Sequence, residues 1–296
     1  GAAAASGRAV MGWFGRAERG FALGIRQMAV PLGGAAGALS LPLAVRAGGL
    51  DAAMLVLAAG CAAGAVAAGA WIREPSAEVA AEDRTAPGAP PPLRDRRVWR
   101  LSVGSALIVC AQTATLSFAV LFLHDHRGVG AAAAAAVLAA IQLGGGLARL
   151  VAGRLSDRRG RRVAPLRRLA AGTAVALLGV AGLTEAPLAV LIPALVGTGI
   201  LAMSWNGLSM TAAAELAGLA QAGTAIGLQG TVMRIPQAGI GVAFGAVVAS
   251  SSWALAFALL AALPLAGWAL IAPLEPEEER RLAISTQSRH ERAVTA

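Results

Sequence analysis

Long apolar stretches, separated by short polar segments, run through the whole of this 296-residue chain. A helix needs about 20 apolar residues to cross the hydrocarbon core of a bilayer. These stretches are too long for the strands of a membrane barrel, and a helix satisfies its own backbone hydrogen bonds where water is absent. The pattern therefore predicts eight membrane-spanning helices, at about residues 21–45, 50–72, 101–123, 130–152, 168–184, 187–214, 222–250 and 252–272.

A shorter apolar segment, Gly1–Phe14, precedes the first predicted span and is too short to cross a bilayer. It has no basic stretch before its apolar residues, so it does not fit a signal peptide. We expect this segment to be the end of a ninth helix that is cut at the start of the sequence.

Composition supports the membrane interpretation. Hydrophobic residues make up 57% of the chain, charged residues only 14%, and the mean hydropathy is +0.67. Soluble domains carry about 25% charged residues, and disordered chains have low hydrophobicity. These values exclude an ordinary soluble enzyme and a disordered protein.

The arginines fall almost entirely on one side of the predicted spans. All 25 basic residues are arginine; 19 lie in alternate loops and the tail, whereas Arg46 and Arg127 alone lie in the loops on the other side. Because basic loops stay in the cytoplasm, we expect the arginine-rich side and the C-terminus to be cytoplasmic, in the cell inner membrane. The net charge of +9 then reflects topology, and we expect no nucleic acid as a partner.

Residues 73–100 differ in kind from the spans, since they combine acidic residues with three consecutive prolines, Pro90, Pro91 and Pro92. Such a composition cannot bury a core. The segment is predicted to be a cytoplasmic linker between two groups of helices.

One loop carries more than a basic charge. Gly153 is followed by Asp157, Arg158, Arg159, Gly160, Arg161 and Arg162. A plain basic loop would explain the arginines but not the glycines and the aspartate at this spacing. The pattern resembles the cytoplasmic loop signature of the major facilitator superfamily, which follows the second helix of each six-helix half. A second segment, with Gly12-Trp13-Phe14 and Glu18-Arg19-Gly20, resembles the connection between helices four and five of that family.

The resemblance implies an all-α membrane protein with the helical bundle of this superfamily. It implies that the chain holds the end of helix four and helices five to twelve of a twelve-helix plan, with the first three helices missing. Residues 1–72 would be the remainder of the N-terminal half, 73–100 the linker, 101–272 the C-terminal half and 273–296 a cytoplasmic tail.

The same resemblance implies a cytoplasmic gate. Asp157 is expected to meet the start of helix five near residues 20–22, and Arg158 and Arg161 to bridge nearby groups or lipid phosphates. The residues expected to form this gate motif are Gly153, Asp157, Arg158, Gly160, Arg161 and Arg162.

Four arginines fall inside apolar runs, and an ionisable residue at membrane depth indicates a cavity or a partner. Arg26, Arg234 and Arg149 could line a central cavity and bind an anion in bidentate fashion. Alternatively, Arg149 and Arg8 could extend to the cytoplasmic face or pair at the gate. The full set of candidates for the cavity is Arg26, Gln27, Gln112, Gln142, Arg149, Trp205, Asn206 and Arg234.

The tract from Ala148-Arg149 to Asp157 also resembles the nitrate/nitrite and cyanate branch of the family, in which an arginine of helix eight contacts the anion. Arginine occurs at this place in other branches too, so the resemblance favours an anion without deciding the substrate. For the polar candidates the alternative interpretation is hydrogen bonding between helices.

These observations favour a secondary transporter, a monomer in membrane lipid, that moves a small solute by alternating access. Two alternatives stay open: an exporter of drugs or hydrophobic metabolites, and a non-transporting membrane sensor or assembly protein. No enzymatic activity and no cofactor are expected. His124-Asp125-His126 is expected to be a solvated turn and not a metal site.

Overall fold

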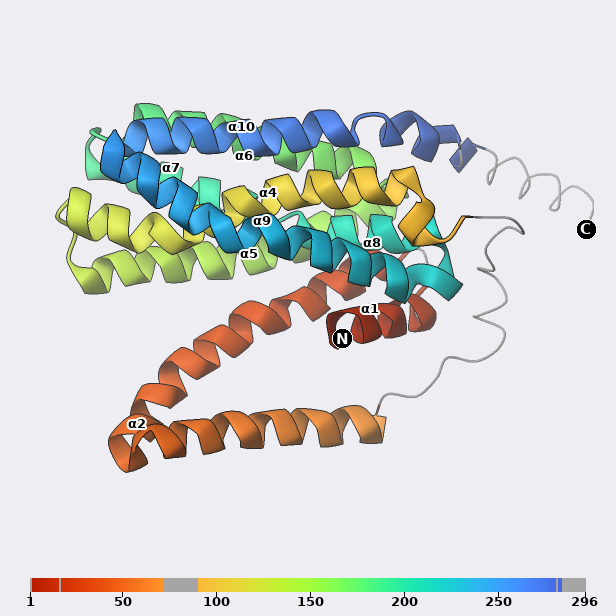
Figure 1. Cartoon of the computed structure of the whole chain (residues 1–296), viewed down its shortest axis with the longest axis horizontal. Coiled ribbons are helices and arrows are strands. Elements are labelled where there is room, and N and C mark those ends of the chain that lie inside the picture. The colour runs from red at the N-terminus through yellow and green to blue at the C-terminus, as the bar shows by residue number, and fades with distance from the viewer. Residues whose placement is uncertain (1, 16, 72–89, 281, 284–296) are drawn as a thin grey trace, which may run out of the picture.

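The computed structural model describes residues 2–15, 17–71, 90–280 and 282–283. Figure 1 shows that helices run back and forth along one common direction. The α-helices are α1 (Ala2–Trp13), α2 (Arg19–Trp71), α4 (Arg96–Leu121), α5 (Ala131–Arg159), α6 (Val163–Gly182), α7 (Leu188–Met203), α8 (Asn206–Ala217), α9 (Ala222–Ser250) and α10 (Trp253–Ile271). Short helical turns lie at Pro92–Arg94, Phe122–His126 and Leu219–Gln221.

Helix α2 folds back on itself at two glycines and so forms two arms (Figure 1). Gly49 has a φ of 71° and a ψ of −164°, a backbone conformation open in practice only to glycine. The predicted break between residues 45 and 50 is therefore confirmed. The second arm, residues 50–71, leaves most of its side chains exposed.

Seven helices within the described residues are long and apolar enough to cross a membrane: Leu43–Trp71, Arg96–His126, Ala131–Arg159, Val163–Gly182, Leu188–Ala217, Ala222–Ser250 and Trp253–Arg280. The first arm of α2, on the predicted span 21–45, is not among them, so the predicted count of eight spans and part of a ninth is not confirmed. The prediction for 187–214 was one continuous helix, whereas the structure breaks it at Ser204 and Trp205 into α7 and α8.

Helix α4 begins at Arg96, five residues before the predicted span. The side chain of Asp95 caps it by accepting a hydrogen bond from the Arg97 N–H at 2.9 Å. An aspartate at this position satisfies an otherwise unpaired donor of the first turn. The predicted linker therefore ends earlier than residue 100; the rest of that prediction, from residue 73 to 89, lies outside the described residues.

Apolar side chains hold α1 and the start of α2 against the bundle formed by α4 to α10. Met11 and Leu23 are fully buried and pack with Met210 of α8 and Ile226 of α9 in one hydrophobic cluster. This cluster fixes the position of the first turns of α2. The candidate site depends on that position.

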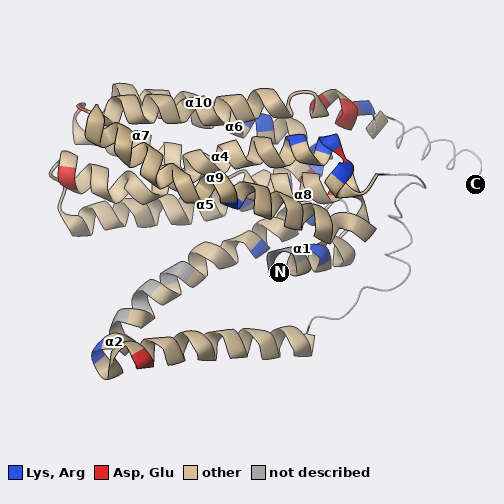
Figure 2. Ribbon diagram, in the orientation of Figure 1, with Lys and Arg blue, Asp and Glu red and all other residues tan. Residues whose placement is uncertain are grey.

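Basic side chains concentrate at one end of the bundle, as Figure 2 shows. We call this the arginine-rich end; it comprises the starts of α2 and α4, the end of α5 and the start of α6, residues 17–21, 94–100 and 154–168. The opposite end carries Arg46 and Arg127. Which of the two ends faces the cytoplasm stays a prediction.

Candidate functional site

Asp157, near the end of α5, contacts the first turn of α2. Its Oδ1 accepts a hydrogen bond from the Gly20 N–H at 2.9 Å, and its Oδ2 accepts one from the Phe21 N–H at 2.8 Å. The first N–H groups of a helix have no partner within the helix, and that end carries partial positive charge. The carboxylate therefore caps α2 from another helix. This is the contact that the resemblance implied for Asp157; its role as a gate stays a prediction.

Glycine makes this contact possible because the two backbones nearly touch. A Cβ on Gly153 would lie 2.5 Å from the Gly20 carbonyl oxygen, and a Cβ on Gly20 would lie 2.7 Å from Asp157 Oδ1. One turn farther along α2, away from the arginine-rich end, a Cβ on Gly24 would lie 3.2 Å from the Arg149 carbonyl oxygen. The glycines thus allow α2 to sit directly on α5.

Gly160 has a different function in the same motif. It ends α5 in the left-handed conformation, with a φ of 64°, and its N–H donates to the Asp157 carbonyl at 3.2 Å. Glycine is the residue that such a helix end favours. The turn reverses the chain, which brings Arg162 back against α5.

Arg162 is 2% exposed and lies among acidic side chains. Its Nη1 donates to Asp157 Oδ1, and its Nη2 donates to Glu215 Oε1 of α8 at 3.2 Å. Burial works to lower the pKa of Arg162, but the charges of Glu215 and Asp157 outweigh it and raise that pKa above its ordinary value. Asp157, Arg162 and Glu215 therefore form a charged chain that joins α2, α5 and α8.

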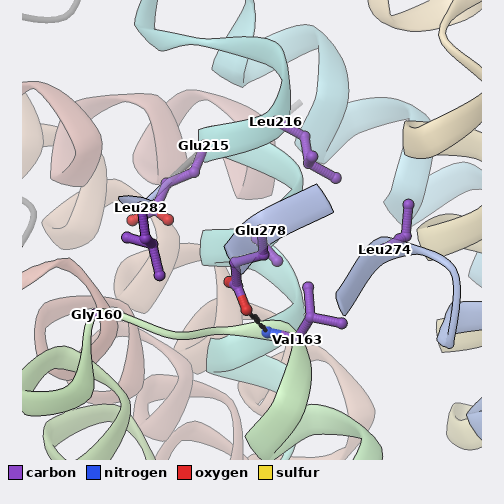
Figure 3. A pocket seen from close by; sticks show the side chains of 8 residues that line it. Gly160, Val163, Glu215, Leu216, Leu274, Glu278 and Leu282 are labelled. Atoms are coloured by element: carbon purple, nitrogen blue, oxygen red, sulfur yellow. Dashed lines mark hydrogen bonds between the residues drawn. The ribbon is translucent and has the colours of Figure 1, made fainter. Parts of the chain in front are cut away.

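Glu278 closes the site from the C-terminal side. Figure 3 shows its carboxylate directed at the Val163 N–H, beside a small cavity of about 40 Å³ that Glu215 and Leu282 also line. Glu278 Oε1 also accepts from the Arg162 N–H at 2.6 Å. The helical residues 274–280 thus cap the start of α6, at the N-terminal helix end where negative charge is favoured.

Two arginines of the motif, Arg158 and Arg161, were expected to bridge nearby groups or lipid phosphates, and their contacts differ. Arg158 is exposed and forms no hydrogen bond or ion pair with another described residue, because it points away from the buried face of α5. Arg161 is half exposed and pairs with Glu279 at 3.0 Å. The arginine that bridges the acidic groups is Arg162, while Arg154 stacks on the Phe21 ring at 4.2 Å.

Arg149 lies on α5 two turns before Asp157 and is 5% exposed. Its Nε donates to the Met203 carbonyl at 2.7 Å, and its Nη1 donates to the Gln27 carbonyl at 2.9 Å. Its guanidinium is thus buried between α2 and α7. It pairs with the backbone of α2 and α7.

Arg26 lies beside Gln27 on the first arm of α2. Its Nε donates to Ser6 Oγ at 2.8 Å, and its Nη1 donates to Gln27 Oε1 at 3.0 Å. Arg26 also lines a cavity of about 380 Å³ with residues of α1 and with Trp71. Of the eight cavity candidates, Arg26, Gln27 and Arg149 are thus brought together.

The remaining candidates lie apart from these three. Asn206 Nδ2 donates to Gln112 Oε1 at 2.9 Å, which joins α8 to α4. Gln142 is half-buried, and its Oε1 has no hydrogen-bond partner among the described residues. Arg234 of α9 is exposed and forms no hydrogen bond or ion pair with a described residue.

Trp205, which was predicted to line a cavity, is buried in the core of the bundle. It is 1% exposed, packs with Leu101 and Leu166 in the core, and donates its indole N–H to the Ala202 carbonyl at 2.8 Å. Its place at the break between α7 and α8 directs it into the bundle.

A buried polar cluster was not predicted from the sequence. Gln229 of α9 is fully buried and donates to Ser209 Oγ at 2.7 Å, and Ser209 Oγ lies 2.5 Å from Ser105 Oγ of α4. Ile226, Gln229 and Met233 stand three and four positions apart on the buried face of α9. This helical spacing is the sequence signal that could have indicated the burial of Gln229.

Comparison with known proteins gives a consistent result. The profile of the Major Facilitator Superfamily matches residues 1–239. The chain is 34% identical over 288 residues to an uncharacterized MFS-type transporter of Mycobacterium tuberculosis (strain H37Rv) and, at the same identity and length, to another of strain CDC 1551. Each alignment covers 97% of this chain and 64% of the relative, so the chain spans less than two thirds of the length of the relatives that it matches.

Proposed function

We propose that this chain, which belongs to the major facilitator superfamily, forms part of a secondary transporter that moves a small solute across the cell membrane by alternating access. Residues 1–72 would supply the remainder of one half, and residues 101–272 the other half. The observation that carries the proposal is the contact between these parts at the arginine-rich end, where Asp157 caps the start of α2.

The contact has the properties of a gate. It joins two parts of the chain through hydrogen bonds to one carboxylate, beside the apolar cluster of Met11 and Leu23 with Met210 and Ile226. When α2 moves away, its first N–H groups regain water, while Arg162 keeps Glu215 as a partner. The polar groups therefore have partners both when α2 is in contact with α5 and when it has moved away. A substrate can then shift the population between these two states.

An anion is the substrate class that the arginines favour. Arg26 and Arg234 lie within apolar helices, and a guanidinium matches a carboxylate or oxyanion with two parallel hydrogen bonds. An anion that binds Arg234 would displace no partner of this side chain among the described residues. Gln112 and Asn206 offer neutral polar groups for further contacts.

The test is uptake of a panel of small anions, including nitrate, nitrite, cyanate and short carboxylates, by the full-length protein in proteoliposomes. Arg26→Ala and Arg234→Ala are each expected to abolish uptake of the anion that the wild type carries. Arg8→Ala is the matched control, since Arg8 is exposed on α1, and it is expected to retain uptake.

Full uptake in both Arg26→Ala and Arg234→Ala would refute the anion proposal. Movement of hydrophobic cations in place of anions would favour an exporter, and movement of no solute would favour a sensor or assembly role. We also propose that the arginine-rich end faces the cytoplasm, since basic loops are retained there.

A further inference from the structure

The buried guanidinium of Arg149 has an unusual set of partners. It donates to two main-chain carbonyls, those of Met203 and Gln27, and pairs with no carboxylate among the described residues. A charged group at membrane depth is costly and normally has a specific partner. The question is why two carbonyls inside helices are available to it.

The Gln27 carbonyl is available because of a proline. In an α-helix the carbonyl of residue 27 accepts from the N–H of residue 31. Residue 31 is Pro31, which has no N–H. The helix continues through this position, so the Gln27 carbonyl is left for a side chain, and Arg149 Nη1 takes it at 2.9 Å.

The Met203 carbonyl is available because α7 ends there. The chain turns at Ser204 and Trp205 before α8 begins, so the last carbonyls of α7 have no complete set of helical donors. That helix end carries partial negative charge, which favours a cation beside it. Arg149 Nε donates to this carbonyl at 2.7 Å.

These two carbonyls belong to parts of the chain that can separate. Gln27 lies on α2, in the proposed N-terminal half, whereas Met203 and Arg149 lie in the other half. A Cβ on Gly24 would lie 3.2 Å from the Arg149 carbonyl oxygen, and a Cβ on Gly207 would lie 3.5 Å from the Gly24 Cα. Arg149 therefore reaches Gln27 because α2 is seated closely against α5 and α8.

We propose that Arg149 and Pro31 form a second clasp of the closed state, two turns deeper in the membrane than Asp157. Pro31 supplies the unpaired Gln27 carbonyl, and Arg149 uses it to hold α2 against the break between α7 and α8. Arg149 is thus a positioning residue that stabilises one conformation. The inference rests on the proposed alternating access.

The test weakens the clasp by replacing Pro31, which carries no charge, and leaves Arg149 in place. Pro31→Ala provides an N–H that pairs with the Gln27 carbonyl inside α2 and so competes with Arg149. The readout is the distance distribution between spin labels at Glu18→Cys and Arg159→Cys in the full-length protein without its native cysteines. Both label sites are exposed at the arginine-rich end.

We expect Pro31→Ala to lower the ratio of closed to open populations about tenfold, the lower end of what a hydrogen bond to a charged group contributes. Arg149→Met should lower the ratio at least as much, and adding Pro31→Ala to it should change little more. Pro236→Ala is the matched control, because it removes a helical proline from α9, where no described side chain donates to the freed Val232 carbonyl.

An unchanged ratio in Pro31→Ala, or effects of Pro31→Ala and Arg149→Met that simply add, would overturn the proposal. If Arg149→Met does not fold, Arg149→Lys replaces it in the pair, since a lysine keeps the charge and can reach one carbonyl. A wild-type protein that shows one conformation under all conditions would count against alternating access itself, which separates the two failures.

Discussion

Gly153→Ala places a methyl group at the point where α5 and α2 approach most closely. Its Cβ would lie 2.5 Å from the Gly20 carbonyl oxygen, 2.7 Å from the Gly20 carbonyl carbon and 3.0 Å from the Phe21 nitrogen. All three are backbone atoms of the first turn of α2, so no flexible side chain can move to make room. The methyl group must push α2 away from Asp157.

The size of the effect follows from two opposing contributions. Added volume at a tightly packed contact costs about 1–3 kcal/mol, whereas alanine is more favourable than glycine inside a helix by about 1 kcal/mol. The helix gain applies equally to the closed and open states, but the clash applies to the closed state alone. The ratio of closed to open populations should therefore fall about 5- to 150-fold.

The assay is the distance distribution between spin labels at Glu18→Cys and Arg159→Cys, in full-length protein without its native cysteines. Gly153→Ala is expected to enlarge the longer-distance population. Gly197→Ala is the control, because no atom lies within 4 Å of a Cβ there, and it should leave the distribution unchanged. A wild-type distribution in Gly153→Ala would refute the inference that this contact closes the arginine-rich end.

Three further predictions concern the charged chain. Asp157→Asn should shift the same distances toward the open population, because the amide keeps one acceptor and loses the charge that favours the start of α2. Arg162→Gln should lower the melting temperature, since removing one partner from a buried ion pair costs about 3–5 kcal/mol; an unchanged melting temperature would contradict the pairing with Glu215. Raising the pH from about 7 to 10 should leave the contribution of Arg162 intact, because its pKa is raised and stability from a raised pKa is lost only as the pH passes through that pKa; loss of the closed population in that range would contradict this.

Helix positions could be read from the sequence because they depend on local composition. The predicted span 222–250 coincides with α9, and the break near residues 46–49 coincides with the glycines of α2. The start of α4 was misplaced because Arg96, Arg97 and Arg100 reduce its apolar character, although Asp95 offered a capping signal. Neither Ser204 nor Trp205 is a proline or glycine, the usual signals of a helix break, so the split into α7 and α8 was not readable from the sequence.

The contacts of the candidate site, like the helices, could be predicted only in part. The contact of Asp157 with the start of α2 was implied by the resemblance of its loop motif to that of the family. Which arginine meets Asp157 depends on how the chain leaves Gly160, and the left-handed turn there selects Arg162 over Arg158. The pairing of Arg149 with the Gln27 carbonyl required the packing of α2 on α5; the proline four residues after Gln27 was visible, but the donor that it would meet was not.

The central claim, that the two parts of the chain alternate around a closed arginine-rich end, is tested most directly by measuring both ends of one protein. Labels at Glu18→Cys and Arg159→Cys report the arginine-rich end, and labels at Arg46→Cys and Ser251→Cys report the opposite end; these sites are exposed. The account predicts that Gly153→Ala lengthens the distance at the first end and shortens it at the second. Distances that stay unchanged at both ends, or that lengthen together, would contradict it.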